Sequence, residues 1–268
     1  MSNNLTTQAY WENYYKKSNT EKVHIINVCS AYDSFWQDLL GSDAKDKSLV
    51  EIGGYPGRYL AYLGYKYGIV PTCIDYNEDT KTVENSFKSL GITDYKIIRG
   101  DFTSCKIERK YNYVISNGFI EHFENFNSIM DRHVDFLEPG GKLLIMIPNK
   151  RYLRRIYGYM CDYKNLKAHN LRCMSKRVFE RFAIRNNLKV ERLEYFGGFP
   201  FSVHQELNIV QKIIFKVTRK IFKFHINPYL EKFPSKYLSS ALIGIFEKPH
   251  IYKSPRLESN NPAKIPPP

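Results

Sequence analysis

The sequence is poor in cysteine and has no long apolar run. Its five cysteines are odd in number and form no C-x-x-C pair. This argues against a disulfide framework or a metal cluster and indicates reduced thiols in a cytosolic protein. No stretch supplies the ~18 consecutive apolar residues that a membrane-spanning helix requires. The first residues carry neither a basic segment nor an apolar core, so we expect no export signal.

Acidic residues are scarce in the second part of the chain. Residues 1–150 hold 17 of the 40 Lys and Arg residues and 19 of the 27 Asp and Glu residues, which leaves 23 basic and 8 acidic residues after position 150. The first part is near neutral, and the remainder carries a net charge of +15. Such an asymmetry is typical of a surface that meets phosphates of nucleic acid, of a lipid leaflet or of a substrate. A solvated basic face without a partner is the alternative.

The chain is organised around a glycine-rich turn. An apolar run ends at Glu51 and leads into glycines and then into helical spacing from Leu60, which predicts a strand, a tight turn and a helix. Gly53 and Gly57 can adopt positive φ and let a ligand lie against bare backbone. Tyr55 stands where the dinucleotide fingerprint requires its second glycine, so NAD is disfavoured.

Two further runs predict strands with carboxylates at their ends. The strand over 69–77 contains Asp75, 22 residues after Gly53, close to the ~20 that separate the glycines from the ribose-binding acid in nucleotide folds. The short strand that begins at residue 95 closes with Gly100, Asp101 and Phe102. A carboxylate at such a strand end can accept hydrogen bonds from a nucleoside, although Asp101 could also simply form a tight turn.

The remaining runs complete an α/β pattern. A strand over 111–117 breaks at Asn117 and Gly118, and a helix is expected with Glu121 and His122 near its start. A Pro-Gly-Gly turn precedes a buried strand that ends at residue 149. A helix over 175–187 and strands over 188–196 and 240–248 follow. The alternation predicts an α/β fold with a doubly wound, mostly parallel, seven-stranded sheet and helical insertions.

The glycine turn resembles the first motif of the class I S-adenosylmethionine-dependent methyltransferases. Glu51, Gly53 and Gly57 match, whereas Tyr55 replaces the usual middle glycine. The resemblance implies a Rossmann-like fold, S-adenosylmethionine as the cofactor and methyl transfer as the activity. It also implies the cofactor-binding residues: Glu51, Gly53, Gly54, Gly57, Asp75, Tyr76, Asp101, Phe102, Asn117, Gly118 and, from the N-terminal aromatic cluster, Tyr14.

The resemblance spans residues 46–248. Residues 1–45 are expected to form an N-terminal helical arm whose aromatic residues Tyr10, Trp11 and Tyr14 fold over the methionine end of the cofactor or merely pack. Residues 151–174 and 199–238 are expected to be insertions, and residues 249–268 a disordered tail.

Methyl transfer to a hydroxyl needs a base, and no metal is required. His122 is the first choice because it lies at the expected crevice, and His204 is the second. His169 is interpreted as structural. The preferred acceptor is a hydroxyl of a saccharide or a lipid-linked small molecule. An amino sugar or another small amine, and a non-catalytic scaffold whose site Tyr55 obstructs, stay open.

Nucleic acid is not expected as the acceptor. Residues 116–119 read Ser-Asn-Gly-Phe, where the related amino-base methylases carry N/D-P-P-Y/F. The chain has no Pro-Cys nucleophile and no RNA-binding signature.

A basic amphipathic helix is predicted over 207–224, where five cations recur every three or four residues. It could rest on an anionic leaflet, which would make the cytoplasmic enzyme peripheral at the inner face of the membrane. The alternative is a lid helix with its apolar face packed on the domain.

Overall fold

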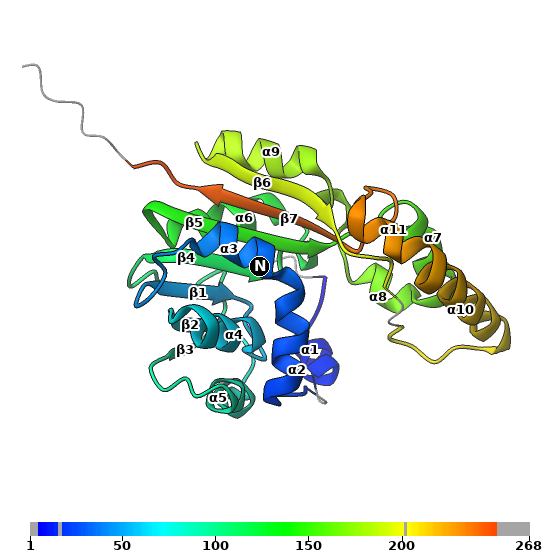
Figure 1. Ribbon diagram of the computed structural model, residues 1–268, viewed down its shortest axis with the longest axis horizontal. Coiled ribbons are helices and arrows are strands. Elements are labelled where there is room, and N and C mark those ends of the chain that lie inside the picture. The colour runs from blue at the N-terminus through cyan, green and yellow to red at the C-terminus, as the bar shows by residue number, and fades with distance from the viewer. Residues whose placement is uncertain (1–4, 16–17, 201–202, 251–268) are drawn as a thin grey trace, which may run out of the picture.

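The computed structural model describes residues 5–15, 18–200 and 203–250 (Figure 1). Seven strands form one sheet: β1 (Ser48–Ile52), β2 (Val70–Asp75), β3 (Lys96–Arg99), β4 (Tyr111–Asn117), β5 (Leu137–Pro148), β6 (Lys189–Phe196) and β7 (Ala241–Glu247). Their order is β3-β2-β1-β4-β5-β7-β6. β7 runs antiparallel to both of its neighbours, β5 and β6, and the other four strand pairs are parallel. The predicted seven-stranded, mostly parallel sheet is confirmed.

Helices cover both faces of the sheet. They are α1 (Gln8–Tyr15), α2 (Lys22–Cys29), α3 (Asp33–Leu40), α4 (Arg58–Tyr67), α5 (Thr80–Ser89), α6 (Phe126–Asp135), α7 (Leu153–Cys161), α8 (Tyr163–Lys167), α9 (Lys176–Arg185), α10 (Ile209–Ile221) and α11 (Asn227–Lys232). Short turns are η1 (Ser30–Tyr32), η2 (Ile120–His122) and η3 (Leu171–Cys173), and the π-helical segment η4 (Phe222–Ile226) joins α10 to α11.

The core lies in two layers because neighbouring strand residues point to opposite faces. In β1, Leu49 packs with side chains of α2, α3, α4 and α5, whereas Val50 packs with those of α6 and α9. Both faces are buried at inner strands such as β1, β4 and β7, which explains their apolar runs, whereas the edge strands β3 and β6 are partly exposed. None of the helices in the described part of the chain has the length and apolar character needed to cross a membrane.

Two local expectations were wrong. The Pro-Gly-Gly segment lies within β5 rather than before it. Leu137 already pairs with Tyr111, and the register then shifts, with Gly140 at φ +78°, so the turn signal marks a bulge. Glu121 and His122 belong to the 3₁₀ turn η2 rather than to a helix start, since α6 begins four residues after His122.

The predicted insertions build a lobe beside the sheet. Figure 1 shows α7, α8, α10 and α11 together at one side of the molecule, beyond the end of the sheet. Tyr157, Cys161, Phe199 and Phe222 form a small apolar core inside this lobe. The predicted tail from residue 251 onward lies outside the described residues.

Candidate active site

The loop between β1 and α4 depends on its glycines. Gly53 has φ +68°, and a Cβ placed on it would come within 2.5 Å of Cδ2 of Phe119. Gly57, with φ +85°, is the residue just before α4. Both positions use the left-handed region that glycine enters readily and other residues avoid. The loop can therefore present bare backbone to a ligand.

Tyr55, at the middle position of the glycine motif, turns away from the site. Its hydroxyl donates to Oδ2 of Asp79 (3.0 Å), and its ring meets Tyr15 edge-on. Its backbone N–H donates to Oδ2 of Asp75 (3.0 Å). Tyr55 lines neither of the two cavities described below. The structure therefore gives no support to an obstruction by Tyr55, on which the scaffold alternative rested.

A first cavity of about 330 Å³ lies at the carboxyl ends of β1 to β4. This edge of an open α/β sheet is where nucleotides and related ligands bind. We call it the cofactor cavity. Its walls include Trp11, Tyr15, Gly53, Asp75, Tyr76, Asp101, Phe102, Gly118 and Phe119.

Asp75 and Asp101, two of the acids on the wall of the cofactor cavity, are held by groups of nearby loops. Asp75 accepts hydrogen bonds from the backbone N–H groups of Asn77 (2.8 Å) and Tyr55 (3.0 Å). Burial raises the pKa of Asp75, and these backbone hydrogen bonds oppose that rise. Asp101 accepts from the backbone N–H and the hydroxyl of Thr103, both at 2.8 Å. Each carboxylate oxygen has two lone pairs, so both residues can still accept from a nucleoside.

A second cavity of about 390 Å³ adjoins the first and shares four residues with it: Trp11, Tyr15, Gly118 and His122. We call it the acceptor cavity. Its walls come from α1, η2, the end of β5, α7, α8 and the segment that contains Pro200 and His204. The shared residues mark where a group would pass from one cavity to the other.

His122 is nearly buried at this junction. Its Nδ1 lies 2.7 Å from the carbonyl oxygen of Ala168, so Nδ1 carries the proton and Nε2 keeps a lone pair. The ring meets Trp11 edge-on, with ring centroids 4.6 Å apart. Burial lowers the pKa of His122 to about 4, against the hydrogen bond to Ala168. The imidazole is therefore neutral at pH 7 and a weak base.

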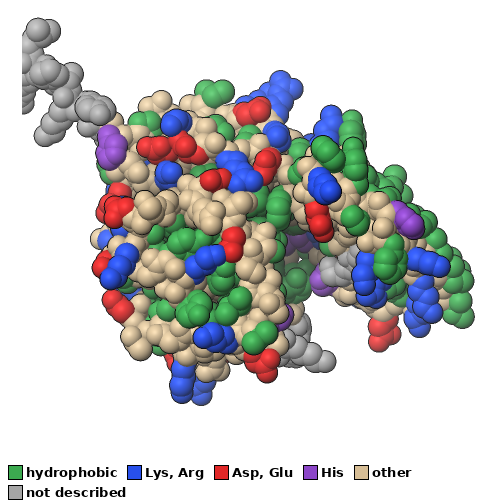
Figure 2. Space-filling view, viewed as in Figure 1, with side chains coloured by type: hydrophobic (Ala, Val, Ile, Leu, Met, Phe, Trp, Pro, Cys, Tyr) green, Lys and Arg blue, Asp and Glu red, His purple; other side chains and the backbone are tan. Residues whose placement is uncertain are grey.

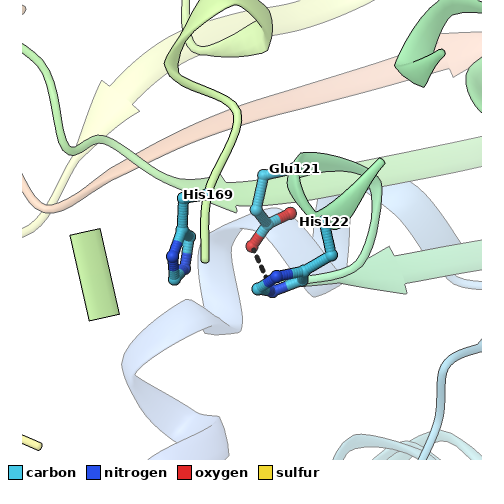
Figure 3. A group of neighbouring side chains, drawn as sticks. All are labelled: Glu121, His122 and His169. Atoms are coloured by element: carbon cyan, nitrogen blue, oxygen red, sulfur yellow. Dashed lines mark ion pairs between the residues drawn. The ribbon is translucent and has the colours of Figure 1, made fainter. Parts of the chain in front are cut away.

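Glu121 and His169 adjoin His122 (Figure 3). An oxygen of Glu121 lies 3.6 Å from Nε2 of His122, and the two imidazole centroids lie 4.6 Å apart. Nδ1 of His169 lies 2.6 Å from the carbonyl oxygen of Asn165. Burial raises the pKa of Glu121 to about 8 and holds the pKa of His169 well below its ordinary value. His169, interpreted from sequence as structural, thus lies on the cavity wall.

These three residues bring one potential ligand atom each within 4.8 Å of one another. Burial and the charge of Lys150 disfavour protonation of both histidines, so their imidazoles are held neutral. The raised pKa of Glu121 also keeps that carboxyl protonated at neutral pH. We interpret the group as a neutral, hydrogen-bonding wall.

His204 lies on the far wall of the acceptor cavity and is paired with Asp162. Its Nδ1 is 3.0 Å from Oδ2 of Asp162, and its backbone N–H donates to Oδ1 of the same carboxylate (3.0 Å). The Asn165 amide also donates to Oδ2 (2.7 Å). Burial would raise the pKa of Asp162, but the hydrogen bonds from His204 and Asn165 outweigh it and lower that pKa. Tyr14 stacks on the imidazole at 5.5 Å between centroids.

The predicted site residues fall into three groups. Gly53, Asp75, Tyr76, Asp101, Phe102 and Gly118 line the cofactor cavity, whereas Tyr14, Asn117, His122 and His204 line the acceptor cavity, with Gly118 and His122 on both. Glu51, Gly54 and Gly57 line neither. The Glu51 side chain packs beneath Gly54, where an added Cβ would meet it at 3.2 Å. We therefore interpret Glu51, Gly54 and Gly57 as residues that shape the β1–α4 loop without lining either cavity.

Several wall residues were missed in the sequence. Lys150, Arg154, Tyr157, Asp162 and Asn165 all line the acceptor cavity. Lys150 had a usable signal, because it follows the carboxyl end of a parallel strand as Asp75 does. The others lie in a predicted insertion, where no motif marked them.

Comparisons with known proteins identify the family. A model described as a methyltransferase domain matches residues 24–193, more than half of the chain. The chain therefore belongs to this methyltransferase family and is an S-adenosylmethionine-dependent methyltransferase. A search of curated proteins finds no match to the sequence.

Solved structures share the fold at low identity. A candidate sarcosine dimethylglycine methyltransferase from Galdieria sulphuraria has a TM-score of 0.57 at 13% identity, covering 90% of this chain and 98% of that one. Geranyl diphosphate C-methyltransferase from Streptomyces coelicolor A3(2) has a TM-score of 0.57 at 13% identity, and the match covers 85% of this chain and 81% of that one. The [4+2]-cyclase SpnF has a TM-score of 0.57 at 10% identity, and the match covers 91% of this chain and 97% of that one. Because one of these folds carries out a cyclisation, the fold alone does not define the acceptor.

Proposed function

We propose that this methyltransferase acts on a hydroxyl oxygen of a saccharide or a lipid-linked small molecule, and that His204 removes the hydroxyl proton. The observation that carries the proposal is the His204–Asp162 pair on the acceptor cavity, with Nδ1 3.0 Å from the carboxylate. Nδ1 also lies 2.8 Å from the Asn165 side-chain nitrogen. The base role requires that Nδ1 donates to Asp162, which leaves the lone pair of Nε2 to accept a proton. Asp162 would orient the ring and stabilise the imidazolium that forms.

The cofactor supplies an electrophilic methyl group on a sulfonium. The protein's part is to bind and align the acceptor and to remove its proton. Asp75 and Asp101 fit the role of accepting hydrogen bonds from the cofactor, because each carboxylate retains lone pairs facing the cavity. Trp11 and His122 border the passage between the cavities.

The walls of the acceptor cavity suit a polyhydroxylated ligand. Tyr10, Tyr14 and Tyr157 supply aromatic surface, on which the C–H face of a sugar ring can pack. Asn165, Asp162 and His204 supply hydrogen-bonding groups beside it. A few placed polar groups among aromatic walls are what a small-molecule site uses to orient its ligand.

The test compares two histidines. His204→Ala should lower the methylation rate of a hydroxyl acceptor by about 10² to 10⁴ and leave S-adenosylmethionine affinity unchanged. His122→Asn should cost less, since a histidine with a pKa of about 4 is a weak base. The matched control is His225→Ala, because His225 is exposed on η4 and lines neither cavity.

The outcomes separate the acceptor classes. A large loss in His122→Asn with none in His204→Ala would transfer the base role to His122. Small losses in both would favour an amine acceptor, which is nucleophilic once deprotonated, and would contradict oxygen methylation.

We also propose that the lobe rests on an anionic membrane surface when the acceptor is lipid-linked. Helix α10 has three faces. Ile214 and Phe215 pack on the small core of the lobe. A second face exposes apolar side chains, with Ile209 78% exposed and, in η4, Phe224 64% exposed; the others are Val210, Ile213, Val217 and Ile221. The third face is basic: Lys212, Lys216, Arg219, Lys220 and, in η4, Lys223.

The adjoining helix α7 extends this surface. Ile156, Tyr159 and Met160 are exposed on α7, whereas Arg154 and Tyr157 line the acceptor cavity from the same helix. The side chain of Gln211 donates to the carbonyl of Met160 (2.8 Å), which joins α7 to α10. Figure 2 shows hydrophobic and basic side chains together on the projecting lobe. Apolar contacts beside cations are the features of an interfacial helix, each cation adding ~1 kcal/mol near an anionic surface.

Sedimentation with liposomes tests the membrane proposal. Binding to anionic but not to neutral vesicles, weakened by salt, is expected. Binding to anionic vesicles should be lost when four lysines are replaced by glutamate, in the variant Lys212/Lys216/Lys220/Lys223→Glu. It should be weakened in the variant Ile213/Val217→Ser. Both variants should still bind S-adenosylhomocysteine. An absence of binding at low salt would contradict the proposal.

A further inference from the structure

Two cations lie on the wall of the acceptor cavity, in the segment that follows β5. Asn149 is fully buried, and its side-chain amide donates to the carbonyls of Lys236 and Ser239, both at 3.0 Å. Nη1 of Arg154 donates to the carbonyls of Asn149 and Ser240, both at 2.8 Å. Lys150, the residue after Asn149, is held through its backbone N–H, which donates to Sδ of Met174 (3.2 Å). The segment is therefore firmly placed.

The ammonium of Lys150 belongs to a nearly buried residue. The residue is only 8% exposed, and it forms no side-chain hydrogen bond and no ion pair within residues 5–15, 18–200 and 203–250. Burial and the charge of Arg154 lower the pKa of Lys150 to about 7, and burial lowers the pKa of Arg154 to about 10. The lowered pKa reflects the cost of this buried charge, and an anionic ligand bound beside Lys150 would favour its charged form.

The acids of the cavity compensate these cations only in part, because the charge of Asp162 acts on both and that of Glu121 on Lys150 without a direct ion pair in the described residues. Asp162 is occupied by His204 and Asn165, and it forms no ion pair with Lys150 or Arg154. Glu121 has its pKa raised to about 8 by burial, so its carboxyl is largely protonated at neutral pH. The field in this part of the cavity is therefore positive, which suits an anion.

We propose that the acceptor carries a phosphate group, as a monoester or diester, and that Lys150 and Arg154 bind it in the acceptor cavity. This inference rests on the proposed function, because it assigns the anion to the molecule that is methylated. The guanidinium of Arg154 is a geometric match for phosphate oxygens, and Lys150 adds a point charge. Both side chains line the cavity that contains His204, so one acceptor can place its phosphate on the cations and its hydroxyl at the imidazole.

Binding measurements test this without turnover. Calorimetry with wild-type protein, free and saturated with S-adenosylhomocysteine, would compare glucose 1-phosphate with glucose, and farnesyl phosphate with farnesol. At least one phosphate probe should bind tenfold or more tightly than its neutral parent, which is the scale of a charge-assisted hydrogen bond. Preference for glucose 1-phosphate would indicate a soluble acceptor, and preference for farnesyl phosphate a lipid-linked one.

The variant test uses Lys150→Met, which replaces a buried cation with an apolar chain of similar length and should not disrupt folding. It should lose about tenfold in phosphate affinity, Lys150→Arg should retain most of it, and S-adenosylhomocysteine affinity should be unchanged in both. Lys164→Met, at an exposed lysine of α8, is the control.

Equal affinity of wild-type protein for the phosphates and their neutral parents would overturn the inference, whatever the variants do. So would unchanged phosphate binding in Lys150→Met. Failure of the proposed function would appear separately, as an absence of cofactor binding or of methyl transfer to any hydroxyl.

Discussion

The two cavities meet at Trp11 and His122 but hold their charged groups in different ways. In the cofactor cavity, Asp75 and Asp101 accept hydrogen bonds from groups of nearby loops, most of them backbone N–H groups. In the acceptor cavity, Asp162 is held by two side chains and one backbone N–H, and Lys150 has no hydrogen-bonding or ion-pair partner in the described chain. The first site is shaped by local backbone and is complete in itself. The second depends on tertiary packing, and a ligand would complete it.

The largest effect is expected at the glycine turn of the cofactor cavity. Gly53→Ala adds a Cβ within 2.5 Å of the Phe119 ring, at φ +68°. Backbone strain of about 1 to 2 kcal/mol and overpacking of about 1 to 3 kcal/mol should add up in the lost affinity for S-adenosylhomocysteine or in the free energy of unfolding. Calorimetry and denaturant unfolding would measure both.

Gly91→Ala is the control for this experiment. Gly91 has φ +74°, but nothing lies within 4 Å of an added Cβ. It should therefore show the strain alone, with cofactor affinity unchanged. Equal effects of the two substitutions would remove the argument that the Gly53 backbone is reserved for close approach.

A smaller effect is expected from Asp75, the proposed ribose-binding acid. Asp75→Ala should weaken S-adenosylmethionine binding by roughly 1.5 to 3 kcal/mol, the range for a charged hydrogen-bonding partner. Asp94→Ala, at an exposed aspartate, should change nothing. Wild-type affinity in Asp75→Ala, or tight binding of NAD, would contradict the assignment of the cofactor cavity.

The third prediction separates burial from function. Burial lowers the pKa of both His122 and His133 to about 4, although only His122 lines a cavity. The pKa of such a histidine is 6.5 in the unfolded chain and lower in the folded protein. The unfolded state therefore takes up the proton first as the pH falls. The histidine's contribution to stability is fully present above pH 6.5 and is lost as the pH falls toward 4. His133→Leu should therefore gain about 2 kcal/mol relative to wild type between pH 7 and pH 5. Urea unfolding at the two pH values measures this gain, and an unchanged difference would show that His133 is not held neutral.

Much of the cofactor cavity could be predicted because its residues follow consecutive strands. Asp75, Asp101 and Gly118 each lie at or just beyond the carboxyl end of an apolar run, and parallel strands bring those ends to one edge. The same rule would have found Lys150 after β5. The orientation of Tyr55 could not be predicted, because it depends on Asp79, 24 residues away.

Most of the acceptor cavity could not be predicted, because its contacts join segments that share no pattern. Asp162 and His204 are 42 residues apart in two predicted insertions, and no spacing rule links them. The sequence favours His122 as the base because it places this residue at the crevice. Sequence cannot show the burial that lowers its pKa to about 4.

The central claim is that the two cavities form one site, with the cofactor on the glycine turn and its reactive end toward the shared residues. A crystal structure with S-adenosylhomocysteine tests it directly. We predict the adenosine between Asp75 and Phe102 and the sulfur facing the junction formed by Trp11, Gly118 and His122. Adenosine bound elsewhere, or a sulfur directed away from the acceptor cavity, would contradict the account.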